Sequence, residues 1–241
     1  PSTRLVLTPD SPSEFLARVI LAHFSLPNIN KDWLTPEDGS KQVLNHLKKS
    51  RAADKKAFVM WQPHIAKALK EPGYKVLLDS SQLKGYIVDV LVAERSFLKE
   101  NPSLIQTFTE GYFRALFHYQ NKSNGIQTLI TQDANLLDSE KLDSQLANAV
   151  AKGVQWKNTV DNYSHFGLEG RQASVNHPYL EDMIGNIMGV LIKTKSIATD
   201  PLNGQYNTLY YDQVLKALKA SQFRPGQDLN LIQGLQNQAE T

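Results

Sequence analysis

The chain has 241 residues, of which 41% are hydrophobic and 21% are charged, and its formal net charge is +2. These values are typical of a globular chain with a core, and they exclude an intrinsically disordered one. The nearly balanced charge favours no nucleic-acid partner, and the absence of cysteine excludes disulfides and thiolate metal sites. No apolar run approaches the ~20 residues of a membrane-spanning helix, so we expect no direct membrane span.

The first third of the chain alternates strand-like and helix-like patterns. A helix is predicted from a cap at Ser11 to about residue 23 or 24, and further helices are predicted for "SKQVLNHLKK" and "PHIAKALKE". Strands are predicted at residues 4–8, 57–61 and 75–78. Because short strands that alternate with helices are typical of a mainly parallel sheet, we expect these three strands in one sheet.

The pattern changes after residues 80–85, where we place the boundary between two lobes, 1–84 and 85–241. One more strand is predicted at 87–93, followed by a short helix and by a long one that begins after Asn101-Pro102. The remainder has helical periodicity. Its candidate helices are residues 126–131, 139–150, 155–166, 178–194 and 209–220.

Motifs of catalysis and cofactor binding are missing from the sequence. The six histidines have neither H-x-x-x-H nor H-E-x-x-H spacing, which leaves a metal site with little support. The sequence contains no G-x-S-x-G, and neither a phosphate-binding P-loop nor a G-x-G-x-x-G turn follows a predicted strand. We therefore predict no catalytic residues, no metal and no cofactor.

The stretch "TPDSPSEF" at residues 8–15 can be a helix cap or an anion site. Ser11 fits the N-cap, Pro12 the first helical position, and Glu14 completes an S-x-x-E capping box. Ser13 is not used by that box, and the start of a helix attracts negative charge. We expect Ser11 to be mainly structural and Ser13 to be available to a ligand.

The stretch "FVMWQPH" ends a predicted buried strand with Trp61 and Gln62. In open α/β sheets, ligands bind beyond the carboxyl ends of the strands, and Pro63 would stop the strand there. Trp61 is therefore a candidate ligand contact, with a lid over the core as the alternative.

These stretches, taken in order, carry a family resemblance. "TPDSPSEFLARVIL", "AFVMWQPHIAKALKEPGYKVLLDSS" and "GYIVDVLVAERSFLKENPSLIQTFTEGYFRAL" together resemble solute-binding proteins of ABC importers, in the nitrate, sulfonate, taurine and thiamine-precursor branch. The resemblance covers about residues 4–120. The tail from "LEDMIGNIMGV" to "YYDQVLKAL" is similar to a subgroup labelled phosphate-type binding proteins, a label that does not identify the ligand.

The resemblance implies a periplasmic-binding-protein-like (type II) two-lobed α/β clamshell with a helix-rich C-terminal half. It implies ligand-binding roles for Ser11, Ser13, Trp61 and Gln62, and a weaker match places Asp89 in a crossover strand. Gln62 stands where many relatives have an acid. Relatives also have first-lobe strands and helices before the segment that matches Pro1, so the chain is expected to be either a fragment or a divergent form. Residues 1–84 then form the second lobe, and 85–241 form the remainder of the first.

Three classes of function follow. The leading one is a non-catalytic, periplasmic or otherwise extracytoplasmic binding protein or module, which takes a small polar or anionic molecule and delivers it to the membrane permease of an ABC importer. The second is an interaction or sensor domain with a degenerate site. The third is an enzyme of the thiamine-pyrimidine synthase branch, whose histidine and lysine arrangement we cannot place in this sequence.

Overall fold

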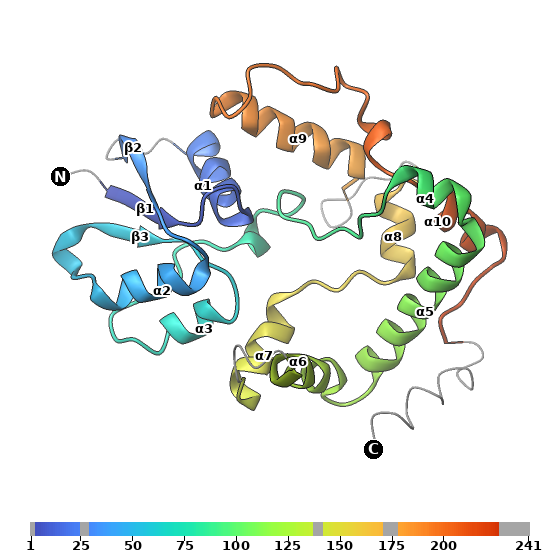
Figure 1. Cartoon of the computed structure of the whole chain (residues 1–241), viewed down its shortest axis with the longest axis horizontal. Helices are drawn as coiled ribbons and strands as arrows, with labels where there is room; N and C mark the ends of the chain where they lie inside the picture. Colours follow the sequence, from blue (N-terminus) through green and yellow to red (C-terminus); the bar gives the residue numbers. More distant parts are fainter. Residues whose placement is uncertain (1–2, 25–28, 137–141, 171–177, 227–241) are drawn as a thin grey trace. The chain divides into compact units, whose positions relative to one another are not determined.

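The computed structural model describes residues 3–24, 29–136, 142–170 and 178–226 (Figure 1). The chain divides into two compact units, each made of several segments. The first comprises Pro1–Val88, Asp143–Gly153 and Asp182–Gln205, and the second comprises Asp89–Leu142, Val154–Glu181 and Tyr206–Thr241. The first break along the chain lies beyond the predicted boundary at residue 84, and later segments return to the first unit.

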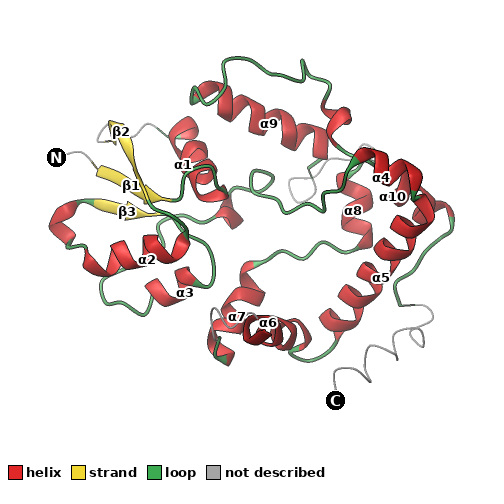
Figure 2. Ribbon diagram, in the orientation of Figure 1, coloured by secondary structure: helices red, strands yellow, loops and turns green. Residues whose placement is uncertain are grey.

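The first unit is built on a three-stranded parallel sheet with the order β2-β1-β3 (Figure 2). The strands are β1 (Thr3–Leu7), β2 (Ile29–Pro36) and β3 (Lys56–Phe58). β1 is central: Leu7 is in register with Pro36 of β2, and Val6 with Phe58 of β3. The predicted α/β class with a parallel sheet is therefore confirmed.

Helices cover both faces of this sheet. The helices are α1 (Pro12–His23), α2 (Ser40–Lys49) and α3 (His64–Ala68). On one face Leu5 and Leu7 pack against Ala17 of α1, whereas Phe58 on the other face packs against Leu44 of α2 and Ala68 of α3. Because successive side chains of a strand point to opposite faces, each apolar strand supplies both layers of the core.

Several further segments complete the first unit. They include the short helices η1 (Ala52–Asp54) and η2 (Ser80–Gln82), the helix α7 (Ser144–Gly153) and most of α9 (Leu180–Lys193). Val190 of α9 packs against Val19 and Ala22 of α1. The Lys193 ammonium donates to the carbonyl oxygen of Ala22, which fastens the end of α9 to α1.

The strand predictions are only partly confirmed. The strands at 4–8 and 57–61 exist, although β3 ends at Phe58. Residues 75–78 and 87–93 are not strands, and Figure 2 draws both segments as loop. Val90, Leu91 and Val92 are 64%, 78% and 81% exposed. Their β propensity finds no partner among the described strands, and an unpaired extended segment is not stable as a strand.

The strand β2 was not predicted, and it is the third strand of the sheet in which we expected residues 75–78. Its sequence "INKDWLTP" contains Asn, Lys, Asp and Pro, which are depleted in strands. Pairing with the central strand β1 outweighs that local preference.

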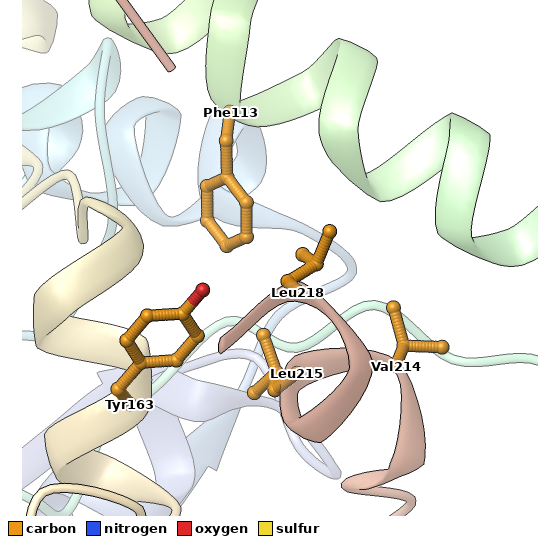
Figure 3. Close-up of a cluster of buried hydrophobic side chains, with 5 residues drawn as sticks. All are labelled: Phe113, Tyr163, Val214, Leu215 and Leu218. Atoms are coloured by element: carbon orange, nitrogen blue, oxygen red, sulfur yellow. The ribbon is translucent and has the colours of Figure 1, made fainter. Parts of the chain in front are cut away.

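The second unit is helical in its described part. It contains α4 (Arg95–Glu100), α5 (Pro102–Asn121), α6 (Gly125–Leu136), α8 (Thr159–His165), η3 (Tyr206–Leu209) and α10 (Gln213–Ala220). Its core combines Phe113 of α5 and Tyr163 of α8 with Val214, Leu215 and Leu218 of α10 (Figure 3). Gly125 begins α6 where a Cβ atom would collide with the carbonyl oxygen of Tyr119, so the turn after α5 requires glycine.

The helix predictions are confirmed, with shifts at the ends. α1, α2 and α5 begin at the predicted residues, because Pro12 and Pro102 occupy first helical positions and Ser40 follows a glycine. The helix predicted at 155–166 begins only at Thr159, after an Asn158 cap that forms a capping box with Asp161. The one predicted at 139–150 runs from Ser144 to Gly153, and residues 139–141 lie outside the described residues.

None of the described helices is long and apolar enough to cross a membrane.

Leu218 is the residue at which the core of the second unit can be tested by substitution, because Leu218 is 0% exposed. Leu218→Ala should lower the free energy of unfolding by about 2–5 kcal/mol, since it removes buried methyl groups and leaves a cavity. Leu209→Ala is the matched control: Leu209 is 54% exposed, and we expect a change within about 0.5 kcal/mol. Urea denaturation measures both variants, and equal losses would contradict this core.

Tyr210 makes the stability of the second unit depend on alkaline pH. Burial, followed by the hydrogen bond and charge of Glu181 and then the charge of Asp212, raises the pKa of Tyr210 from 10.0 to about 12. Its hydroxyl donates to Glu181 Oε1 at 2.6 Å. Because the folded pKa is the higher one, this contribution is complete below pH 10 and is lost as the pH rises to about 12.

We expect the free energy of unfolding, measured in urea, to fall more steeply between pH 10 and 12 for the wild type than for Tyr210→Phe. Glu181→Gln should reduce the additional slope without abolishing it, because burial is the largest cause of the raised pKa. Parallel pH profiles for the wild type and Tyr210→Phe would refute this assignment.

Candidate functional site

The strand order β2-β1-β3 points to one candidate ligand site in the first unit, at the end of the sheet where the strands finish, which we call the carboxyl edge. From β1 the chain moves to β2 on one side and then crosses to β3 on the other, with α1 and α2 on opposite faces. In open α/β sheets, ligands bind beyond the carboxyl ends of the strands between which such a reversal occurs, here the central strand β1 and its neighbour β3. The carboxyl ends of β1 and β3 are therefore the candidate site.

Both predicted stretches meet at this edge. "TPDSPSEF" follows β1 and "WQPH" follows β3 closely, and the Val59 N–H donates to the carbonyl oxygen of Val6 at 2.9 Å. The two strands pair in parallel with Val6 opposite Phe58, so the two stretches leave the sheet side by side. The sequence could not show this adjacency, because the two segments are separated by β2 and two helices.

Ser11 caps α1 as predicted, but the capping box differs. The Ser11 hydroxyl donates to the carbonyl oxygen of Thr8 at 2.6 Å and accepts from the Ser13 N–H at 3.2 Å. Glu14 accepts from the N–H of Asp10 rather than from that of Ser11, at 2.7 Å. Asp10 has a φ of 51°, and this left-handed conformation turns its N–H toward Glu14.

Arg18 balances the charge of Glu14. The Arg18 Nε donates to Glu14 Oε1 at 2.8 Å, and its Nη2 contacts the same oxygen. The guanidinium also donates through Nη1 to the carbonyl oxygen of Thr194 at 3.3 Å. Because Glu14 is neutralised from within α1, the partial positive charge at the start of the helix is left available to an anion.

Ser13 is less accessible than predicted. It is 4% exposed, and its N–H is already used by Ser11. This burial follows from the packing of the first turn of α1 into the unit. Whether Ser13 contacts a ligand stays a prediction.

Trp61 presents its ring at the edge while its main chain is fixed. The Trp61 N–H donates to Ser40 Oγ at 3.2 Å, and the Ser40 hydroxyl contacts the Trp61 carbonyl oxygen at 3.4 Å. Ser40 is 2% exposed, whereas Trp61 is 42% exposed. The ring is thus no lid over the core, and it remains accessible as we expected for a ligand contact.

Gln62 and Asp89 lie in different surroundings. Gln62 is half-buried, its Oε1 accepts from the N–H of Ala66 at 3.2 Å, and its side chain lies beside Gly153 of α7. Asp89 belongs to the second unit and is exposed on a segment that is not a strand, so its predicted place in a crossover strand is wrong. Within the first unit, the structure brings Gln62 to the edge that Ser11 and Trp61 share.

Three helices begin at the carboxyl edge, which gives the site its electrostatic character. α1 follows β1, α2 follows β2 and α3 follows β3, so the N–H groups of their first turns lie at one end of the sheet. α2 has no side-chain cap, and its N-cap Gly39 has a φ of 84°. An anion at this edge would complement the partial positive charge of the helix starts.

Thr8 and Ser40 are site residues that the sequence did not reveal. The Thr8 hydroxyl is buried at the end of β1 without a hydrogen-bond partner in the described parts of the chain. Ser40 was assigned only to a helix, and no local pattern connects it to a residue 21 positions later. Finding Ser40 from the sequence would have required recognition of β2, since α2 follows that strand.

Comparison with known proteins leaves the family open. No protein-family model matches the chain, and neither a curated protein nor a solved structure has significant similarity to it.

Replacing Ser40 tests whether its hydroxyl stabilises the backbone at Trp61. Ser40→Ala leaves the Trp61 N–H without its buried acceptor, and we expect a loss of about 1–3 kcal/mol in the free energy of unfolding. Ser103→Ala is the control, because Ser103 is exposed and should change stability by less than about 0.5 kcal/mol. Guanidinium denaturation followed by tryptophan fluorescence measures both, and a neutral Ser40→Ala would show that this contact does not stabilise the edge.

Proposed function

We propose that the chain is a non-catalytic solute-binding protein or module of an ABC importer, of the two-lobed type II clamshell class, which works in the periplasm or another extracytoplasmic space. Its ligand is a small polar or anionic molecule, and its macromolecular partner is a membrane permease. The proposal combines the sequence resemblance with the site at the carboxyl edge of the first unit.

The single observation that carries the proposal is the exposed Trp61 ring at a reversal of strand order. Its neighbours at this edge are the start of α1, the buried Ser40 and the Thr8 hydroxyl, which has no hydrogen-bond partner among the described residues. A flat ring supplies apolar contact area, while N–H groups at helix starts supply donors for an anion. These are the two kinds of contact that a sulfonate, a nitrate or a substituted pyrimidine requires.

An interaction or sensor domain is the second candidate. It is favoured by the exposed apolar segment around Val90, Leu91 and Val92, since exposed apolar stretches mark contact with other proteins. The two candidates differ in one property: only a solute-binding protein is stabilised by a small molecule.

A thermal-shift screen with nitrate, phosphate, alkyl sulfonates and pyrimidines separates these candidates. A ligand present at 100 times its dissociation constant should add about 2.7 kcal/mol of stability. An anion that stabilises the protein should lose its effect as salt is added at fixed ligand concentration, because salt screens exposed charges. No stabilisation by any compound would favour the interaction domain.

Trp61 supplies the variant test for any compound that binds. Trp61→Ala should abolish the thermal shift, whereas Trp61→Phe should keep most of it, because phenylalanine retains a flat ring. A fluorescence change that the ligand causes in the wild type should disappear in Trp61→Phe if Trp61 is its source. Trp156→Phe is the control for the removal of one tryptophan from the protein. An unchanged shift in Trp61→Ala would remove Trp61 from the site.

A further inference from the structure

A second group of polar side chains lies on the α2 side of the first unit, and the proposed binding function does not use it. His46 of α2 is at its centre. His46 Nδ1 lies 2.6 Å from Glu37 Oε1, just after β2, and His46 Nε2 lies 2.9 Å from the Nζ of Lys56, the first residue of β3. We call these three residues the Glu37–His46–Lys56 chain.

The two contacts fix the roles of the imidazole nitrogens. An ammonium group can only donate, so Nε2 of His46 accepts from Lys56. Nδ1 then carries the ring proton and donates it to the Glu37 carboxylate. The edge-to-face contact with Phe58, at 5.9 Å between ring centroids, also holds the ring, whose side chain is 20% exposed.

The Glu37–His46–Lys56 chain lines a polar pocket of about 280 Å³. Besides the three residues, the pocket is lined by Gln42, Asn45, Lys49, Ser50 and Asp54. Lys49 is exposed and adds an ammonium group to the wall, and Asp54 adds a carboxylate. The Lys56 amine is therefore within reach of small molecules from solvent.

We propose that Lys56 is a modification site, which is acylated in preference to the other lysines by small activated acyl donors with an anionic leaving group, such as acyl phosphates. The geometry is that of an activated nucleophile: an amine within hydrogen-bond reach of a base, which a third group orients. Lys56 is the nucleophile, His46 the base, and Glu37 the positioning residue that also stabilises the imidazolium.

The reaction proceeds in two steps. The Lys56 ammonium first transfers a proton to Nε2 of His46, and the imidazolium that forms faces the Glu37 carboxylate. The nitrogen lone pair then attacks the carbonyl carbon of the acyl phosphate, a C–N bond forms, and the C–O bond to phosphate breaks with its electron pair leaving on phosphate. The nitrogen loses its extra proton to the departing phosphate, and His46 returns its proton to water. The products are an amide and inorganic phosphate.

Lys55 provides a control within the same molecule. It precedes Lys56 in the chain and is exposed, whereas Lys56 is half-buried. Simple access to solvent would therefore favour Lys55, whereas the contact with His46 and the place in the pocket favour Lys56. The change that His46→Gln causes in the ratio of the acylation rates at Lys56 and Lys55 isolates the effect of the base.

The experiment treats the full chain with a low concentration of acetyl phosphate and measures initial acetylation rates at each lysine by peptide mapping. General-base assistance contributes about 10²–10⁴-fold in enzymes, so we expect Lys56 to react at least about ten times faster than Lys55. His46→Gln should bring this ratio to one or below without changing the rate at Lys55. Glu37→Gln keeps an acceptor for Nδ1–H but lacks the charge, so its ratio should be intermediate.

His23→Gln is the matched control, because His23 contacts Tyr86 in the same unit and should leave the ratio unchanged. Circular dichroism establishes whether each variant is folded. If His46→Gln does not fold, Glu37→Gln decides: a reduced ratio supports the proposal, and an unchanged one overturns it. A wild-type ratio of one or less, or an unchanged ratio in folded His46→Gln, also overturns it.

Discussion

The pairing of β1 with a parallel strand on each side is the constraint on which the first unit depends. On one side, the carbonyl oxygen of Leu7 accepts a hydrogen bond from the Glu37 N–H, just after β2. On the other side, the carbonyl oxygen of Val6 accepts one from the Val59 N–H, just after β3. A strand with two parallel neighbours is buried on both faces, so helices must cover each face. The positions of α1, α2 and α3, and the meeting of their first turns at one edge, all follow from that arrangement.

The local signals in the sequence were sufficient for most helices and for two of the strands. Proline at the first helical position and apolar residues at helical spacing are short-range features, and they located α1 and α5 closely. Strand pairing is a long-range property. β2 has a polar sequence and is paired, whereas residues 75–78 and 87–93 are β-prone and are not strands, so propensity alone gave the wrong answer for three segments.

The candidate site was predictable as two separate stretches but not as one place. Ser11 and Trp61 were identified because each follows a strand, which is a local observation. Their adjacency depends on the order β2-β1-β3, and the burial of Ser13 depends on how the first turn of α1 packs. The link between Ser40 and Trp61 joins residues 21 positions apart, and the Glu37–His46–Lys56 chain likewise joins α2, β3 and the segment just after β2.

The contact between Ser40 and Trp61 has a consequence for the thermodynamics of recognition. With both main-chain groups of Trp61 held by one buried hydroxyl, the backbone beneath the indole is immobilised when the unit folds. The entropy of ordering this residue is then lost during folding and not during encounter with a ligand. Only rotation of the indole about its own side-chain bonds remains to be restricted. If a ligand binds at this edge as we propose, its recognition would rest on shape and charge that exist before the ligand arrives.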